Sequence, residues 1–139
     1  MKQREFLLAI PDRVRPLLDD ADFQWVQRWS LLKLWYGENP KIHFEVWFHR
    51  RIERVEIGLH FEADAATNDR LCAHFEDNLF VAKAEISERV EAESWDKGWA
   101  RVYEMLPLGP LDDAFLDRVA RRLARFVVAL QPLLDDAIG

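Results

Sequence analysis

Histidines and glutamates alternate with apolar residues between positions 42 and 62, and these residue types could carry chemistry. The histidines are His43, His49 and His60, and the glutamates are Glu45, Glu56 and Glu62. Imidazole nitrogens and carboxylate oxygens bind zinc and manganese ions, and a histidine beside a carboxylate can perform acid–base catalysis. Alternating polar residues are also expected on the solvated outer face of a sheet. We favour this second interpretation, so the sequence predicts no catalytic, cofactor-binding or metal-binding residue.

Two further features carry reactive or charged groups. Cys72 is the sole cysteine and follows Leu71, so we expect a partly buried, inert thiol. A run of arginines near the carboxyl end could contact phosphates or an acidic partner, although an amphipathic helix needs charge on its exposed face in any case. These residues are Arg118, Arg121, Arg122 and Arg125. No glycine-rich phosphate loop or Gly-x-Ser-x-Gly motif occurs, and we predict no cofactor.

The polar residues between 42 and 62 are positioned by two runs of strict alternation, which indicate two half-buried strands. The apolar positions are Ile42, Phe44, Val46 and Phe48 in the first run, and Val55, Ile57, Leu59 and Phe61 in the second. Residues 50–54 connect the runs, so we expect an antiparallel hairpin. Both apolar sets share a face if Phe44 lies opposite Leu59 and His43 opposite His60.

The segments before the hairpin are less regular. Residues 6–18 have helical apolar spacing, but Pro11 and Pro16 argue against one continuous helix, so one or two short helices are expected. Residues 23–36 are ambiguous, because the first half would suit a helix while 31–36 is typical of a strand.

After the hairpin, an apolar stripe from Leu71 to Val90 predicts one long helix, with Asp64, Thr67 or Asn68 as its N-cap. Residues 99–106 form a further strand. Asp112 or Asp113 caps a final helix. Its core stripe is Leu116, Val119, Leu123, Phe126, Val127, Leu130 and Leu134.

This order of elements predicts a single α+β domain over residues 1–139. Its antiparallel sheet has a three-strand meander plus one further strand, with long helices packed on one face, in the order α-βββ-α-β-α. The net charge of −6 and the pI near 5.2 argue against nucleic-acid binding. The single cysteine favours a reducing compartment, and no apolar run approaches a membrane span. We expect a cytoplasmic protein with no membrane partner.

From Arg51 onward the chain resembles an uncharacterised bacterial domain found near the carboxyl end of some restriction-endonuclease-like proteins. The residues that carry this resemblance are 51–59, Leu71, Glu76, Ile86, Glu88, Trp95, 99–102, Leu123, Phe126, Val127 and Pro132. The resemblance implies a prokaryotic accessory module and supplies no site residues. The element order is also similar to that of small acidic secretion chaperones, which are dimers that bind disordered partner segments; this second likeness is topological, and a fold does not establish a function.

The sequence favours a non-enzymatic interaction or accessory module that binds a protein partner or self-associates as a homodimer. Alternation points Trp47 outward, where its ring is either covered by Trp25 or Trp29 or buried in an interface. The expected contact surface is therefore the outer sheet face, with Trp47, His43, Glu45, Glu56 and His60. The alternative function is a small metal-dependent hydrolase or nuclease that uses the histidines and glutamates of this face.

Overall fold

Strict alternation in residues 42–61 produces the two central strands of the sheet, β3 (Ile42–His49) and β4 (Arg54–Phe61). In the computed structural model, which describes residues 1–138, these strands pair antiparallel with Phe44 opposite Leu59 and His43 opposite His60. The predicted register is confirmed. A short 3₁₀ turn (Arg50–Ile52) connects the strands and ends at Glu53 in the left-handed region, with φ 53°.

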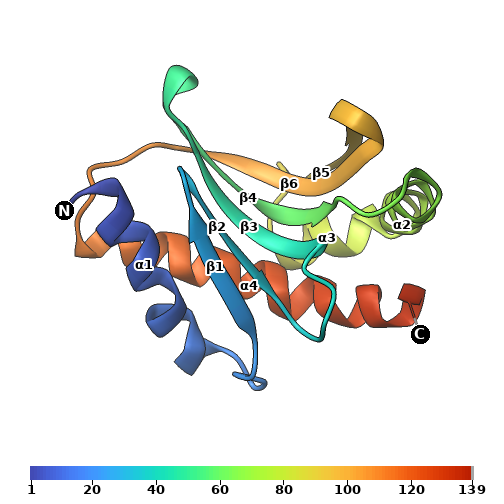
Figure 1. The fold of residues 1–139 in the computed structure, drawn as a ribbon, viewed down its shortest axis with the longest axis horizontal. Helices are drawn as coiled ribbons and strands as arrows, with labels where there is room; N and C mark the ends of the chain where they lie inside the picture. Colours follow the sequence, from blue (N-terminus) through green and yellow to red (C-terminus); the bar gives the residue numbers. More distant parts are fainter. Residues whose placement is uncertain (139) are drawn as a thin grey trace.

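Across the described residues, the sheet has six antiparallel strands in the order β1-β2-β3-β4-β6-β5 (Figure 1). The other strands are β1 (Gln24–Arg28), β2 (Leu31–Trp35), β5 (Glu91–Trp95) and β6 (Trp99–Pro107). The predicted fold class is confirmed, but the sheet has two more strands than the four expected. The ambiguous segment forms the β1–β2 hairpin, which turns at Trp29 with φ 50°. Strand β5 pairs with β6 through a tight connection at residues 96–98.

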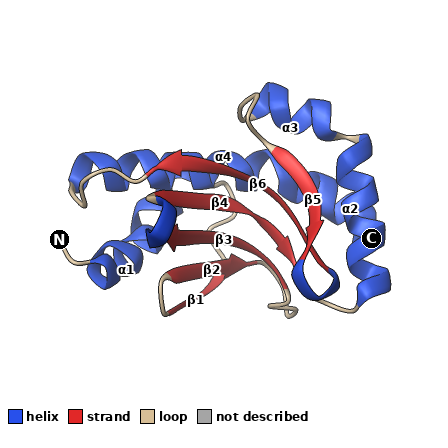
Figure 2. Ribbon diagram, turned by 90° about the horizontal axis from the view of Figure 1, so that it is seen from above, coloured by secondary structure: helices blue, strands red, loops and turns tan. Residues whose placement is uncertain are grey.

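In this part of the chain, four helices cover one face of the sheet (Figures 1 and 2). They are α1 (Gln3–Val14), α2 (Ala65–Asp77), α3 (Leu79–Glu85) and α4 (Asp113–Ile138). Pro11 does not break α1, and only Pro16 lies outside it, in a 3₁₀ turn over Arg15–Leu17. The single long helix expected from Leu71 to Val90 is wrong: the chain breaks at Asn78, whose side-chain amide donates to the carbonyl oxygen of His74.

Two of the predicted N-caps are confirmed. The side chain of Asp64 accepts from the backbone N–H of Thr67 at 3.1 Å. Asp112 accepts from the N–H of Phe115 at 2.9 Å. Asn68 instead uses its side chain to hold the backbone of Ala63 and Gly98.

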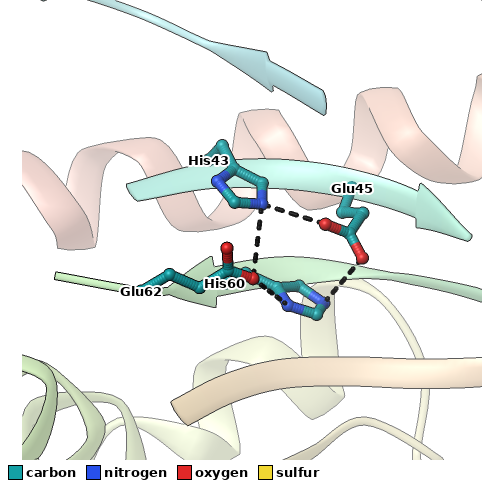
Figure 3. Close-up of side chains that lie close together, drawn as sticks. All are labelled: His43, Glu45, His60 and Glu62. Carbon is teal, nitrogen blue, oxygen red and sulfur yellow. Dashed lines mark hydrogen bonds and ion pairs between the residues drawn. The ribbon is translucent and has the colours of Figure 1, made fainter. Parts of the chain in front are cut away.

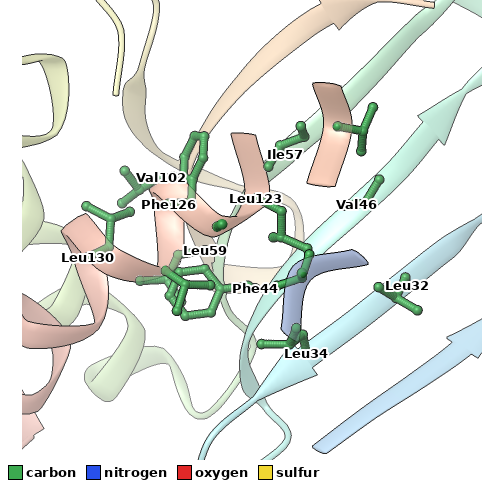
Figure 4. Close-up of a cluster of buried hydrophobic side chains, with 14 of the residues drawn as sticks. Leu32, Leu34, Phe44, Val46, Ile57, Leu59, Val102, Leu123, Phe126 and Leu130 are labelled. Atoms are coloured by element: carbon green, nitrogen blue, oxygen red, sulfur yellow. The ribbon is translucent and has the colours of Figure 1, made fainter. Parts of the chain in front are cut away.

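The core lies between the helices and the inner face of the sheet, as Figure 4 shows. Leu123, Phe126 and Leu130 of α4 are fully buried, as are Leu59 and its apolar neighbours on β3, β4 and β6. The predicted apolar stripe of α4 is therefore confirmed, and each fully buried Leu or Phe contributes on the order of 1.5–3 kcal/mol by its removal from water.

The sequence-based expectation is wrong for one of the four arginines expected on the exposed face of α4. Arg122 is not on the solvated face of α4, because its guanidinium donates to both carboxylate oxygens of Glu104 at 2.6 and 2.8 Å. Glu104 lies on the inner face of β6 and is 1 % exposed. The pair satisfies a buried carboxylate and fixes α4 against β6.

Within residues 1–138, no helix is both long enough and apolar enough to span a lipid bilayer.

Candidate metal centre

The tripeptide His-Phe-Glu occurs twice in the central hairpin, at residues 43–45 on β3 and at residues 60–62, where β4 ends at Phe61. Alternation sends both phenylalanines into the core, where Phe44 and Phe61 are buried. The histidines and glutamates therefore lie on the outer face, opposite the helices. Because His43 and His60 are direct cross-strand partners, each strand contributes one glutamate to opposite ends of the histidine pair (Figure 3).

The four side chains approach one another closely. His43 Nε2 lies 3.0 Å from Glu45 Oε1 and 3.8 Å from Glu62 Oε2. His60 Nδ1 lies 3.4 Å from Glu62 Oε2, and its Nε2 lies 3.7 Å from Glu45 Oε2. One potential ligand atom from each residue falls within 4.8 Å of the other three. Two ligands about 2.0–2.1 Å from a tetrahedral zinc ion are themselves about 3.3 Å apart, so small side-chain movements would bring all four onto one ion.

The outer neighbours of the histidines fix which nitrogen faces this group. His43 Nδ1–H donates to the carbonyl oxygen of Pro40 at 2.8 Å. His60 Nε2–H donates to Glu56 Oε2. These bonds leave His43 Nε2 and His60 Nδ1 as the inward nitrogens, which is the arrangement that metal-binding histidines use to set their tautomer.

The inward nitrogen of His60 is not satisfied by the described residues alone, whereas His43 Nε2 lies at hydrogen-bond distance, 3.0 Å, from Glu45 Oε1. His60 Nδ1 is buried and forms no well-aligned hydrogen bond within residues 1–138, although Glu62 Oε2 lies near it. A neutral imidazole nitrogen and a carboxylate oxygen are both acceptors, so two such lone pairs that face each other need a shared proton or cation. A positive ion bound between these atoms would therefore satisfy both lone pairs.

The outer face is buried here, which corrects the expectation of a solvated surface. His43, Glu45, Glu56 and His60 are only 0–3 % exposed, and Glu62 is 13 % exposed at its side chain. Alternation identifies the face on which a side chain lies, but it does not report the curvature of the sheet or which large side chains lean over that face.

The cover comes from large side chains of the sheet itself. The rings of Trp47 on β3 and Trp95 on β5 lie 6.1 Å apart, although two strands separate β3 from β5, a distance of about 14 Å in a flat sheet. Trp95 packs edge-on against His60. Trp25 and Trp29, which the sequence offered as the alternative to burial of Trp47 in an interface, are 39 % and 81 % exposed.

Charge around the histidines is dominated by carboxylates. Burial alone would raise the pKa of Glu56, but hydrogen bonds from His49 and His60 and the charges of His60 and Arg101 lower it to about 2. Burial would lower the pKa of His60, yet the hydrogen bond with Glu56 and the nearby carboxylates of Glu62 and Glu45 raise it to about 9. Without a bound metal ion, the imidazole of His60 therefore carries a second proton and a positive charge at neutral pH.

A count of the permanently charged side chains around the histidines also gives an excess of negative charge. Arg101 pairs with Glu56 and Glu93, each at 2.6 Å, and Lys33 pairs with Glu62 at 3.6 Å. Glu93 is 41 % exposed, so three buried or half-buried carboxylates, Glu45, Glu56 and Glu62, face the two permanent cations Arg101 and Lys33. A further positive charge, carried by a proton on His60 or by a metal ion in its place, would balance this excess, whereas an unbalanced buried charge is costly.

The structure brings together three of the five residues expected at the contact surface, His43, Glu45 and His60, and adds Glu62 to them. Glu56 supports His60 from outside the group, and Trp47 covers it. His49 contacts only Glu56 within the cluster, at 3.0 Å. The repeated His-Phe-Glu tripeptide was the sequence signal for Glu62, whereas nothing local in the sequence indicated Arg101 or Trp95.

The chain matches no protein-family model, no curated protein and no solved structure.

Proposed function

We propose that this domain is an accessory module that binds one divalent transition-metal ion of the zinc class. The ligands are His43 Nε2, His60 Nδ1 and one carboxylate oxygen each from Glu45 and Glu62. One observation carries the proposal: two imidazoles, each held by an acceptor on its other nitrogen, converge with two carboxylates within 4.8 Å. Mixed nitrogen and oxygen ligands suit zinc and its first-row neighbours. The proposal departs from the sequence-based expectation, which assigned no metal.

The burial of the ligands favours a structural ion over a catalytic one. The side chains of His43 and His60 are fully buried, and Glu45 is 3 % exposed. A catalytic zinc site keeps one coordination position open to water and substrate, whereas a structural site is closed by protein ligands. The hydrolase or nuclease alternative therefore has less support than a stabilising ion that neutralises the carboxylates.

The interaction role expected from the sequence stays a proposal, with a changed surface. Trp47 is the one member of the expected contact set that is more than slightly exposed. Its ring lines a surface hollow of about 580 Å³ together with His49, Arg50 and Ile52. A protein partner or a second copy of the chain would meet this rim rather than the buried histidines.

Metal titration of the full chain tests the proposal. We expect the wild type to bind one zinc ion per chain by calorimetry, and cobalt to give the intense visible absorption of a tetrahedral site. His60→Gln and Glu62→Gln should each weaken binding by more than about tenfold, since even the loss of a supporting residue has an effect of that size. His74→Gln is the matched control, because His74 lies on α2 and contacts the carbonyl oxygen of Leu133.

Circular dichroism establishes that each variant is folded before its titration is compared. A folded wild type that takes up no stoichiometric zinc or cobalt would overturn the proposal. Equal zinc affinity in the wild type and in folded His60→Gln would also overturn it, because the ion would then lie elsewhere.

A further inference from the structure

A cleft with an excess of positive charge lies beside Glu62, on the side away from the histidines. Its volume is about 420 Å³, within the roughly 300–1,000 Å³ range typical of small-ligand sites. The charged and aromatic residues that line it are Arg28, Lys33, Lys41, Trp35, Trp99 and Glu62. The cleft is lined from strands β1 and β2, which lie side by side in Figure 2, from the residues just before β3 and just after β4, and from Trp99 at the start of β6.

The sheet register explains why these residues meet. Val26 and Lys33 are direct partners across β1 and β2 and therefore share a face. Arg28 and Trp35 lie two residues from these positions on their own strands, so alternation places them on the same face. Lys41 precedes β3, and its carbonyl oxygen accepts from the N–H of Glu62 at 2.8 Å.

The positive charge in this cleft is unusual for an acidic chain with net charge −6. In the described residues, Arg28 and Lys41 form no ion pair, and Lys33 has only Glu62, at 3.6 Å. Three cations thus face a single carboxylate inside a concave surface. Such a surface concentrates field lines and raises the local concentration of anions.

Two indole rings supply flat apolar walls. Trp35 and Trp99 are each partly exposed and line the cleft with the cations. Aromatic side chains bind planar rings through their faces, while arginine and lysine bind phosphate oxygens. A phosphate monoester carries about −1.5 to −2 charges at neutral pH, which matches the uncompensated cations better than a single carboxylate.

We propose that this cleft binds a small phosphate monoester with a planar ring, whose phosphate contacts Arg28, Lys33 and Lys41 and whose ring lies against Trp35 or Trp99. This inference goes beyond the proposed metal binding and does not require it. Glu62 joins the two sites, because its Oε1 faces Lys33 while its Oε2 faces both histidines. If the proposed ion takes up the Glu62 charge, Lys33 is released for the phosphate and affinity in the cleft rises.

Phenyl phosphate is the probe, and the six tryptophans supply the readout through their indole N–H signals in ¹⁵N-correlated NMR spectra. Trp35→Phe and Trp99→Phe assign two of these signals. In protein dialysed free of metal, phenyl phosphate should shift the Trp35 and Trp99 signals in a saturable way. The signal of Trp29, which is 81 % exposed at the β1–β2 turn, should not move. Benzyl alcohol and inorganic phosphate separate the contributions of ring and charge, and each should bind more weakly.

Charge-removing variants complete the test. Arg28→Gln and Lys41→Gln should each weaken phenyl phosphate binding by at least about tenfold, the effect expected from the loss of one charge-assisted contact. Arg51→Gln, at an exposed position in the β3–β4 connection, should bind like the wild type. Equal affinity for benzyl alcohol and phenyl phosphate would overturn the proposal. So would unchanged binding in both folded cleft variants.

The same titration in His60→Gln separates this proposal from the metal site. Retained phenyl phosphate binding in that variant would support the cleft even if zinc does not bind. A wild type that binds zinc but gives no saturable shift with phenyl phosphate would refute the cleft alone.

Discussion

Replacing Gly58 with alanine should destabilise the fold through a clash between two central strands. Gly58 lies on β4, directly between Glu45 of β3 and Tyr103 of β6. A Cβ added at this position would lie 2.5 Å from the carbonyl oxygen of Val102, 2.7 Å from Tyr103 Cβ and 2.9 Å from Tyr103 Cα. Carbon atoms in contact are normally about 3.5–4.0 Å apart. Two of the three obstacles are backbone atoms, so β4 and β6 must separate.

The magnitude follows from what this separation disturbs. Overpacking of a close-packed site costs about 1–3 kcal/mol, and each ladder hydrogen bond that lengthens forfeits up to about 1 kcal/mol. Replacing glycine by alanine recovers about 0.5–1 kcal/mol of chain entropy. The net loss of unfolding free energy should be about 2–3 kcal/mol, or roughly 6–15 °C in melting temperature for a chain of this size.

Urea unfolding followed by circular dichroism measures this loss, with Gly37→Ala as the matched control. Gly37 has φ +78°, and a methyl group added there would meet no neighbouring atom within 4 Å, so alanine at this position should lose only about 1 kcal/mol to backbone strain. If Gly58→Ala unfolds within about 0.5 kcal/mol of the wild type, the close approach of β6 to Gly58 is refuted.

Two other predictions concern the core and the cysteine. Phe44→Ala and Leu123→Ala should each lower the unfolding free energy by about 2–5 kcal/mol, because both side chains are buried at 0–1 % exposure; a loss below half a kcal/mol at either site would contradict the inner-face assignment. Burial and the neighbouring Glu76 raise the pKa of Cys72 to about 11, so the reactive thiolate is about one part in a thousand at pH 8. Ellman's reagent should therefore label native Cys72 far more slowly than the urea-unfolded chain, with faster labelling as pH rises towards the pKa, and equal rates in the two states would exclude a protected thiol.

The central hairpin could be predicted from the sequence because the alternating pattern that defines its strands lies entirely within the strands themselves. Both runs alternate without exception, and a slip of one residue would move Phe44 or Leu59 out of the core. The apolar stripe of α4 is equally explicit, since seven positions at helical spacing are all buried. In these elements, each residue's place is fixed by its own neighbours along the chain.

The two edge strands could not be predicted, because their own sequences do not alternate. Strand β5 reads Glu91-Ala-Glu-Ser-Trp95, and none of its residues is fully buried. Its extended form depends on pairing with β6, which lies later in the chain. The break at Asn78 could not be predicted either. Ile86 and Val90 continue the apolar spacing of the preceding helical residues, although helix α3 ends at Glu85.

The polar face of the hairpin was predicted correctly as a set of residues and wrongly as a surface. Alternation placed His43 and His60 on the face away from the helices, and the register placed them together. Their burial depends on Trp95 and Arg101, which come from strands that are distant in sequence. Contacts of this kind leave no periodic signal near the histidines.

The confinement of all four proposed ligands to residues 43–62 has a consequence for folding kinetics. Structural sites whose ligands come from distant segments cannot assemble until most of the chain is in place, because long loops must close first. Here a single β-hairpin brings the ligands together, and hairpins form in about 1–10 μs when isolated. An ion bound at this stage would lower the folding barrier as well as stabilise the final state. This follows because β2 and β6 must pair with the two edges of the hairpin that the ion stabilises.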